Sequence, residues 1–183
     1  MKADVLAPPS ELAGWATVLL TGSGALPWVR DLTRWSDVVA ELLAPNGSLV
    51  LYEGHPLNWI WDPRARTVQF RTARGYFDAR AEPNDDFPAR ATERLSPTGA
   101  PVPHAWEHQW ALGQVVTAVA AAGFRIEQLV EYAAHFWPQF PSVPQEELAR
   151  LPHSFLLVAR HESEPRPTAI DADPCPQPNA RCS

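Results

Sequence analysis

The chain has 183 residues, of which 45% are hydrophobic and 20% are charged, and this composition is typical of one soluble globular domain. Its formal net charge of −6 argues against generic attraction to a nucleic-acid backbone. No stretch approaches the roughly 18 consecutive apolar residues of a membrane span, and the N-terminus lacks the apolar core of a signal peptide. We therefore expect a cytoplasmic protein that binds neither nucleic acid nor a membrane.

The first part of the chain predicts one strand–helix–strand unit over residues 17–56. Residues 17–21 form a short apolar run, which is typical of a strand buried on both faces. Asp31 suits the N-cap of the following helix, whose predicted buried stripe has helical spacing: Leu32, Trp35, Val38, Val39, Leu42 and Leu43. Pro-Asn-Gly at 45–47 ends this helix, and residues 48–53 form the second predicted strand. Such a crossover predicts a parallel sheet.

Two later segments lack a regular pattern. Residues 57–103 combine aromatic side chains with many Pro, Arg and Asp, and we interpret them as an insertion over one end of the sheet that could act as a substrate lid. Within this insertion, residues 66–79 could form one or two short strands. Residues 133–151 are predicted to be a Pro-rich loop with a short polar turn at 145–150.

The remaining elements are one helix and two strands. The second helix is predicted over residues 107–122, and Gly123 is its natural C-terminal stop. Residues 124–132 and 154–159 are predicted strands, whereas residues 161–183 have no apolar period and are expected to be a disordered tail. The order β-α-β-insertion-α-β-β predicts an α/β fold whose last strand could return antiparallel.

Six short motifs occur in order along the chain: Asp4-Val5-Leu6-Ala7-Pro8, Gly22-Ser23-Gly24-Ala25-Leu26-Pro27-Trp28, Pro45-Asn46-Gly47, Glu53-Gly54-His55-Pro56, Trp106-Glu107-His108-Gln109-Trp110 and Pro152-His153-Ser154-Phe155. As an ordered set covering residues 1–160, they resemble the C-terminal half of a class I S-adenosylmethionine-dependent methyltransferase. The resemblance implies a partial Rossmann-like sheet, with strands equivalent to 4, 5, 7 and 6 of the family order 3-2-1-4-5-7-6. It also implies S-adenosylmethionine as cofactor and methyl transfer to a small-molecule acceptor.

The chain departs from this family at its start. The Gly-rich turn after family strand 1 and the acidic residue after family strand 2 would lie before residue 1, and the common Phe-Asp pair is Trp15-Ala16 here. The resemblance therefore implies a truncated half-domain, inactive or impaired as an isolated chain. Because family strand 1 would be missing, residues 17–21 become an apolar edge strand, and we expect instability or self-association through that edge.

The resemblance also implies a site beyond the carboxyl ends of the strands. There His55 is the candidate general base, because histidine titrates near neutrality, and Glu53 is the catalytic partner that orients His55 or the substrate. Two alternatives stay open: His55 could be a turn residue bonded to backbone, and Glu53 could be solvated. The implied cofactor contacts are Asp4 at the adenine and, in the loop after the first strand, Thr21, Gly22, Ser23 and Gly24.

The implied substrate pocket is lined by Trp28, Glu107 and His108. An alternative function uses the same region, because His104, Glu107 and His108 spell H-x-x-E-H, a zinc signature of one peptidase class. Pro101 and Pro103 crowd the start of the motif, and a third acidic ligand would be needed, so we expect no metal. A non-catalytic alternative is a pseudoenzyme that completes its sheet with a partner strand.

Overall fold

The computed structural model describes residues 3–22, 24–72, 74–78, 81–84, 105–135 and 138–162. Over these ranges the chain forms a four-stranded sheet in the order β1-β2-β6-β5, and a separate pair of short strands, β3 and β4. The strands are β1 (Ala16–Gly22), β2 (Leu43–Gly54), β3 (Ala81–Asn84), β4 (Ala105–His108), β5 (Phe124–Tyr132) and β6 (Ser154–His161). The helices are α1 (Leu32–Leu42), α3 (Leu112–Ala121) and α4 (Gln145–Leu148), with 3-10 turns η1 (Ser10–Leu12), η2 (Leu26–Trp28) and η3 (Pro56–Ile60). None of the described helices is long and apolar enough to cross a membrane.

The sheet is mixed, as a strand–helix–strand unit with a returning last strand predicts. β1 and β2 run parallel and are connected through α1, whereas β6 runs antiparallel to both β2 and β5. The predicted α/β class is thus confirmed. The order β1-β2-β6-β5 is also the spatial order of family strands 4, 5, 7 and 6, and equating the strands one by one stays a prediction.

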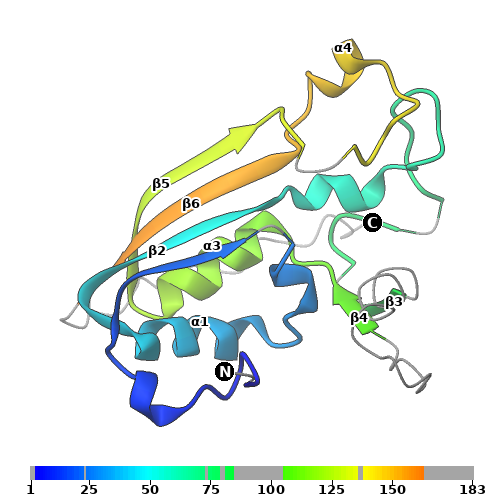
Figure 1. Ribbon diagram of the computed structural model, residues 1–183. Coiled ribbons are helices and arrows are strands. Elements are labelled where there is room, and N and C mark those ends of the chain that lie inside the picture. Colours follow the sequence, from blue (N-terminus) through cyan, green and yellow to red (C-terminus); the bar gives the residue numbers. More distant parts are fainter. Residues whose placement is uncertain are drawn as a thin grey trace, which may run out of the picture.

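Helix α1 forms where the sequence predicts it, because its start is capped and one of its faces is apolar. The carboxylate of Asp31 accepts a hydrogen bond from the backbone N–H of Arg34 at 2.9 Å, which is the expected N-cap. Its buried residues include Leu32, Trp35, Val38 and Val39, all members of the predicted stripe. α1 and α3 lie on the same side of the sheet (Figure 1).

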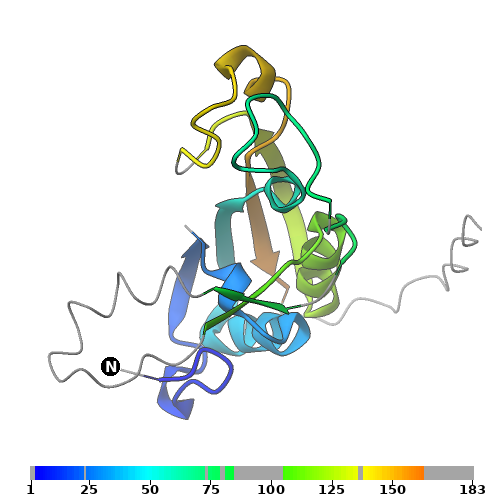
Figure 2. The same cartoon turned by 90° about the vertical axis from the view of Figure 1, so that its right-hand side faces the viewer.

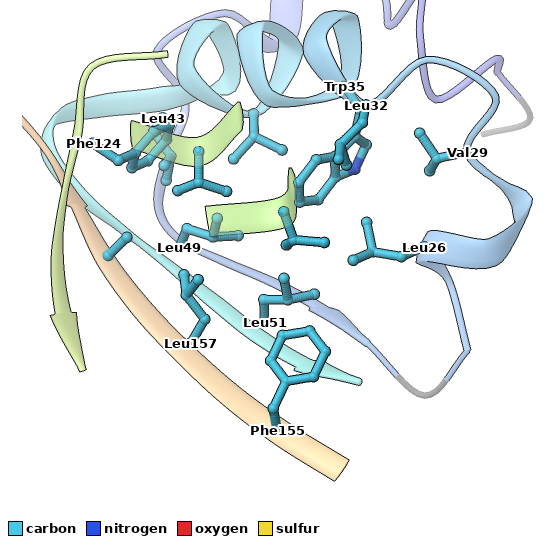
Figure 3. Close-up of a cluster of buried hydrophobic side chains, with 14 residues drawn as sticks. Leu26, Val29, Leu32, Trp35, Leu43, Leu49, Leu51, Phe124, Phe155 and Leu157 are labelled. Carbon is cyan, nitrogen blue, oxygen red and sulfur yellow. The ribbon is translucent and has the colours of Figure 1, made fainter. Parts of the chain in front are cut away.

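One hydrophobic core fills the space between these two helices and the sheet. Leu49 and Leu51 from β2 and Leu157 from β6 are fully buried there, and Trp35 of α1 faces them (Figure 3). Complete burial of one leucine contributes about 1.5–3 kcal/mol relative to an exposed position. The core therefore fixes the register of β2 and β6, and with it the position of the residues that follow them.

The opposite face of the sheet is uncovered in the part of the chain that the structure describes. Val18 is 59% exposed and Leu20 is 72% exposed, both on this face of β1. The expectation that β1 is buried on both faces is therefore wrong for the described chain, because α1 and α3 cover only one side. Among the described strands, β1 pairs only with β2, so it is an edge strand.

The second helix begins later than predicted. It starts at Leu112, and residues 105–108, expected in part to be helical, form strand β4 paired with β3. Two hydrogen bonds fix the start of α3. The backbone N–H of Ala111 donates to the Gln114 side chain at 2.9 Å, and the backbone N–H of Leu112 donates to the Tyr76 hydroxyl at 3.0 Å. The predicted stop at Gly123 fits its positive φ of 87°.

Other boundaries also differ from the sequence-based expectation. β2 begins at Leu43, and a register irregularity between β1 and β2 accommodates the Pro-Asn-Gly segment, where Asn46 has a left-handed φ of 61°. Residues 66–79 are predicted to contain one or two short strands. Among the described residues of this segment, the structure shows only an isolated antiparallel β-bridge, between Trp61 and Phe70. β6 includes His161, so the predicted tail boundary is one residue early, and residues 163–183 lie outside the described chain.

The segment after β2 lies beside α4, at the end of the sheet where β2 finishes (Figures 1 and 2). The backbone N–H of Val68 donates to the carboxylate of Glu147 at 3.1 Å. Phe140, Val143 and Leu148 form a second, smaller cluster, against which Trp61 and Val68 pack. Two loops far apart in sequence are thus fixed side by side near the carboxyl end of β2.

Candidate functional site

The carboxylate of Glu53 connects the carboxyl ends of the two parallel strands. Glu53 lies near the end of β2 and is only 3% exposed. Its two oxygens accept three backbone N–H bonds from the loop after β1, from Gly24 at 2.8 Å, Ala25 at 2.7 Å and Leu26 at 3.1 Å. These charge-assisted bonds compensate the burial of the carboxylate. Glu53 therefore determines where this loop lies.

Two glycines let the chain reach Glu53 from β1. A Cβ atom at Gly22 would lie 2.1 Å from the carbonyl oxygen of Tyr52, so the close approach of the two backbones requires glycine. Gly24 has a φ of 91°, which other residues rarely adopt, and its Cβ direction is open. Ser23, the predicted cofactor contact between them, lies outside the described residues.

His55 is buried, and both of its ring nitrogens are engaged. It is 3% exposed, and its Nδ1 accepts the backbone N–H of Leu57 at 3.1 Å, which caps η3. Its Nε2 lies 2.8 Å from Oε1 of Glu131, but the N–H is not aligned with that oxygen, so the contact is mainly electrostatic. Burial lowers the pKa of His55, and the Glu131 carboxylate partly opposes this shift. The geometry fits the alternative that the sequence left open, a turn histidine bonded to backbone.

A second buried histidine, His153, connects β6 to the loop after β2. It is 1% exposed, and its ring nitrogens lie 2.8 Å from Oδ1 of Asn58 and 2.8 Å from the carbonyl oxygen of Leu148. The ring of His135 stacks on it with centroids 3.6 Å apart. Burial lowers the pKa of His153, although the hydrogen bond to the carbonyl oxygen of Leu148 opposes this shift. Burial together with the nearby His153 lowers the pKa of His135 to about 4. Burial therefore disfavours a charge on either ring, whereas the two oxygen atoms beside the His153 nitrogens suit a ring with two N–H groups.

A small cavity lies beside Glu53. Trp59, His108 and Trp110 are among its other walls, and its volume of about 20 Å³ is enough for a water molecule. The ring of His108 stacks on Trp110, with centroids 5.9 Å apart and planes 8° from parallel. The Nδ1 atom of His108 is buried and has no hydrogen-bond partner among the described residues. It can therefore bond a water or ligand atom.

The other predicted site residues are more dispersed. Asp4 is exposed, and its carboxylate accepts from the backbone N–H of Leu6 at 2.9 Å within a turn that contacts Arg34 of α1. Thr21 lies in β1 immediately before Gly22. Trp28 ends η2 but is not among the residues that line the cavity beside Glu53. The structure thus brings Glu53 and His108 to one cavity.

The zinc motif lacks the helical geometry on which its function would depend. Glu107 and His108 lie in strand β4, where neighbouring side chains point to opposite faces, and His104 lies outside the described residues. No group of three or more His, Cys, Asp or Glu side chains in the described ranges could hold a metal ion. The described geometry therefore does not favour a two-histidine chelate on a helix.

The roles of two residues of this region, Asn58 and Gln109, are not predicted from the sequence. Gln109 is 1% exposed, accepts from Nε of Arg74 at 2.7 Å, and donates to the carbonyl oxygens of Gly75 and Tyr76. These bonds hold the segment around residue 75 against the start of α3. Asn58 and Gln109 are ordinary polar residues in sequence, so only the pairing of distant segments shows their role.

Replacing Glu53 with Gln is expected to lower the free energy of unfolding by about 1–3 kcal/mol, because an amide cannot accept all three N–H bonds and leaves buried groups unpaired. Urea unfolding measures the change. Glu41→Gln is the matched control, since the Glu41 carboxylate is about half exposed, accepts only from Arg34 among the described residues, and should matter much less. Equal effects of the two substitutions would contradict the anchoring role.

Stability should fall as the pH drops from 7 to 5. The unfolded chain binds protons at its histidines near pH 6.5, whereas the lowered pKa values of His55, His135 and His153 mean that the folded state binds fewer protons in this window. The stability is therefore complete above the unfolded pKa and declines below it. Replacing His135 with Phe keeps a ring beside His153 and should make the decline shallower in urea unfolding at several pH values. A pH-independent stability over this window would refute the explanation.

Comparisons with known proteins give a consistent result at the level of structure. No protein-family model and no curated protein matches the sequence. The solved structures that match include a methyltransferase of Listeria monocytogenes (TM-score 0.61, 15% identity, 88% of this chain and 68% of that chain) and one of Mesorhizobium loti (TM-score 0.55, 24% identity, 86% of this chain and 67% of that chain). A third, from Methanosarcina mazei, has a TM-score of 0.51 with 12% identity, and the match covers 88% of this chain and 66% of that chain.

All three are described as S-adenosylmethionine-dependent methyltransferases. At these identities the likeness concerns the arrangement of strands and helices, and it agrees with the mixed sheet and crossover described above. The chain therefore has the α/β fold of class I S-adenosylmethionine-dependent methyltransferases.

Proposed function

We propose that this chain acts in S-adenosylmethionine-dependent methyl transfer to a small molecule, and that its residues form the acceptor side of the site. The observation that carries the proposal is the Glu53 anchor, which fixes the loop after β1 at the carboxyl end of β2. In open α/β sheets, ligands bind beyond the carboxyl ends of the strands. The fold that the chain shares with such methyltransferases supports the same reading.

The described residues supply only one wall of a methyl-donor site. The N–H groups of Gly24, Ala25 and Leu26 are donated to Glu53, so they are not free to bind a cofactor carboxylate. The carboxylate of Asp4 already accepts a bond in its own turn. These residues do not fit a complete donor site, and we propose that this chain alone binds S-adenosylmethionine weakly and is impaired in transfer.

Within this proposal, Glu53 and His55 position the site, and His108 faces the ligand. Glu53 holds the loop after β1, and His55 caps η3 through Nδ1. His108 borders the cavity beside Glu53 and has an unpaired Nδ1 among the described residues. The cytoplasmic location stays a prediction from composition.

The proposal is tested by adding S-adenosylhomocysteine to the isotopically labelled chain and recording amide chemical shifts. We expect weak binding, with a Kd above about 0.1 mM, equivalent to less than roughly 5.5 kcal/mol, and shifts concentrated at Thr21, Gly22 and Gly24. The absence of shifts at millimolar ligand would favour the pseudoenzyme alternative. Micromolar binding would contradict the incomplete donor site, and stoichiometric zinc in an elemental analysis would favour the hydrolase.

We also propose that two copies of the chain associate through β1. Residues 16–22 contain no charge and no proline to discourage pairing, and the strand exposes Val18 and Leu20. Replacing Leu20 with Lys should shift the chain toward the monomer in sedimentation velocity, because a charge on an edge strand opposes pairing. Leu129→Lys, at another exposed leucine away from this edge, should not. Sedimentation at about 100 µM would detect even a weak dimer, with a dissociation constant near that concentration. A wild-type chain that is monomeric under these conditions would refute the proposal.

A further inference from the structure

A second cavity, larger than the one beside Glu53, shares Trp59 with it as a lining residue. Its volume is about 220 Å³. It forms where the segment after β2 meets the loop before α4. The residues that line it include Asn58, Trp59, Trp61, Arg71, Gln139 and Phe140.

The aromatic walls of this cavity are held by their neighbours. The guanidinium of Arg74 lies over the ring of Trp59, 4.7 Å from its centroid, and Arg74 is itself bonded to Gln109 and Glu82. The ring of Trp61 stacks on Phe70, with centroids 4.8 Å apart. Walls fixed in this way are suited to a flat ring, which can stack on them without reordering side chains.

Two of the residues that line the cavity carry donor groups that a ligand could use, Arg71 and Trp61. Arg71 is the only charged residue among those lining it, and the one hydrogen bond of its guanidinium in the described structure is a long contact of 3.5 Å to the carbonyl oxygen of Trp59. The indole N–H of Trp61 is buried and has no acceptor among the described residues. Both polar atoms of the Asn58 amide are bonded to His153. A ligand that uses these two donors must bring an acceptor, and a negative one suits Arg71.

We propose that this cavity binds a small aromatic carboxylate, with its ring against the tryptophans and its carboxylate at Arg71. The volume lies below the roughly 300–1,000 Å³ of drug-sized sites, which limits the ligand to one or two rings. A single guanidinium matches a single carboxylate, which it can bind with two parallel bonds. The inference goes beyond the proposed function, because binding at this cavity needs no methyl donor.

Isothermal titration of the full chain with 2-naphthoate, and separately with the uncharged 2-naphthamide, tests the proposal without any cofactor. The carboxylate should bind about tenfold or more tightly than the amide, since a bond to a charged group is lost with the amide. Arg71→Gln should abolish this preference. Arg66→Gln should retain it, because Arg66 is an exposed cation of the same loop that does not line the cavity.

A second measurement needs no change at Arg71. The indole N–H resonance of Trp61, identified among the eight tryptophans by its loss in Trp61→Phe, should shift when 2-naphthoate is added to the wild-type chain. Equal binding of the two probes, a preference that survives Arg71→Gln, or a preference also lost in Arg66→Gln would overturn the proposal. An unmoved Trp61 resonance at saturating probe would do the same.

Discussion

The buried carboxylate of Glu53 is the interaction on which the rest of the site depends. It lies at the end of a strand whose preceding residues, Leu49 and Leu51, are fixed in the core. Because Glu53 is held in place by this strand, its three hydrogen bonds also hold the loop after β1 in place. Removing a carboxylate from water costs free energy, so Glu53 can be buried only because the loop donates three N–H groups to it. The loop in turn depends on Glu53 as the acceptor for those N–H groups. A residue that sequence reasoning considers catalytic is thereby given a positioning role.

The uncovered face of the sheet follows from how the helices are distributed. α1 and α3 both pack on one side, so the core is complete there while Val18 and Leu20 stay exposed on the other. Parallel strand pairs are generally buried on both faces. In the described chain, the side of the sheet that faces the helices is therefore well packed, whereas the free edge of β1 and the opposite face of the sheet expose apolar side chains.

Much of the fold could be predicted because the signals are local. The apolar stripe with Asp31 as N-cap marks α1, and the β-branched and aromatic pattern of residues 124–132 coincides with β5. Strand β4 could not be found this way, because residues 105–108 depend on pairing with residues 81–84. The partners of Glu53 lie 27 to 29 residues away, and Asn58, one partner of His153, lies 95 residues away. No local sequence pattern reports such contacts. Motif resemblance located Glu53 and His108 but could not assign their partners.

Amide hydrogen exchange of the wild-type chain tests the central claim most directly. If Glu53 anchors the loop, the N–H groups of Gly24, Ala25 and Leu26 should exchange as slowly as those of the neighbouring core strand β2, because they open only with the strand end. Exchange at these three amides as fast as in an unstructured loop, while β2 stays protected, would contradict the account.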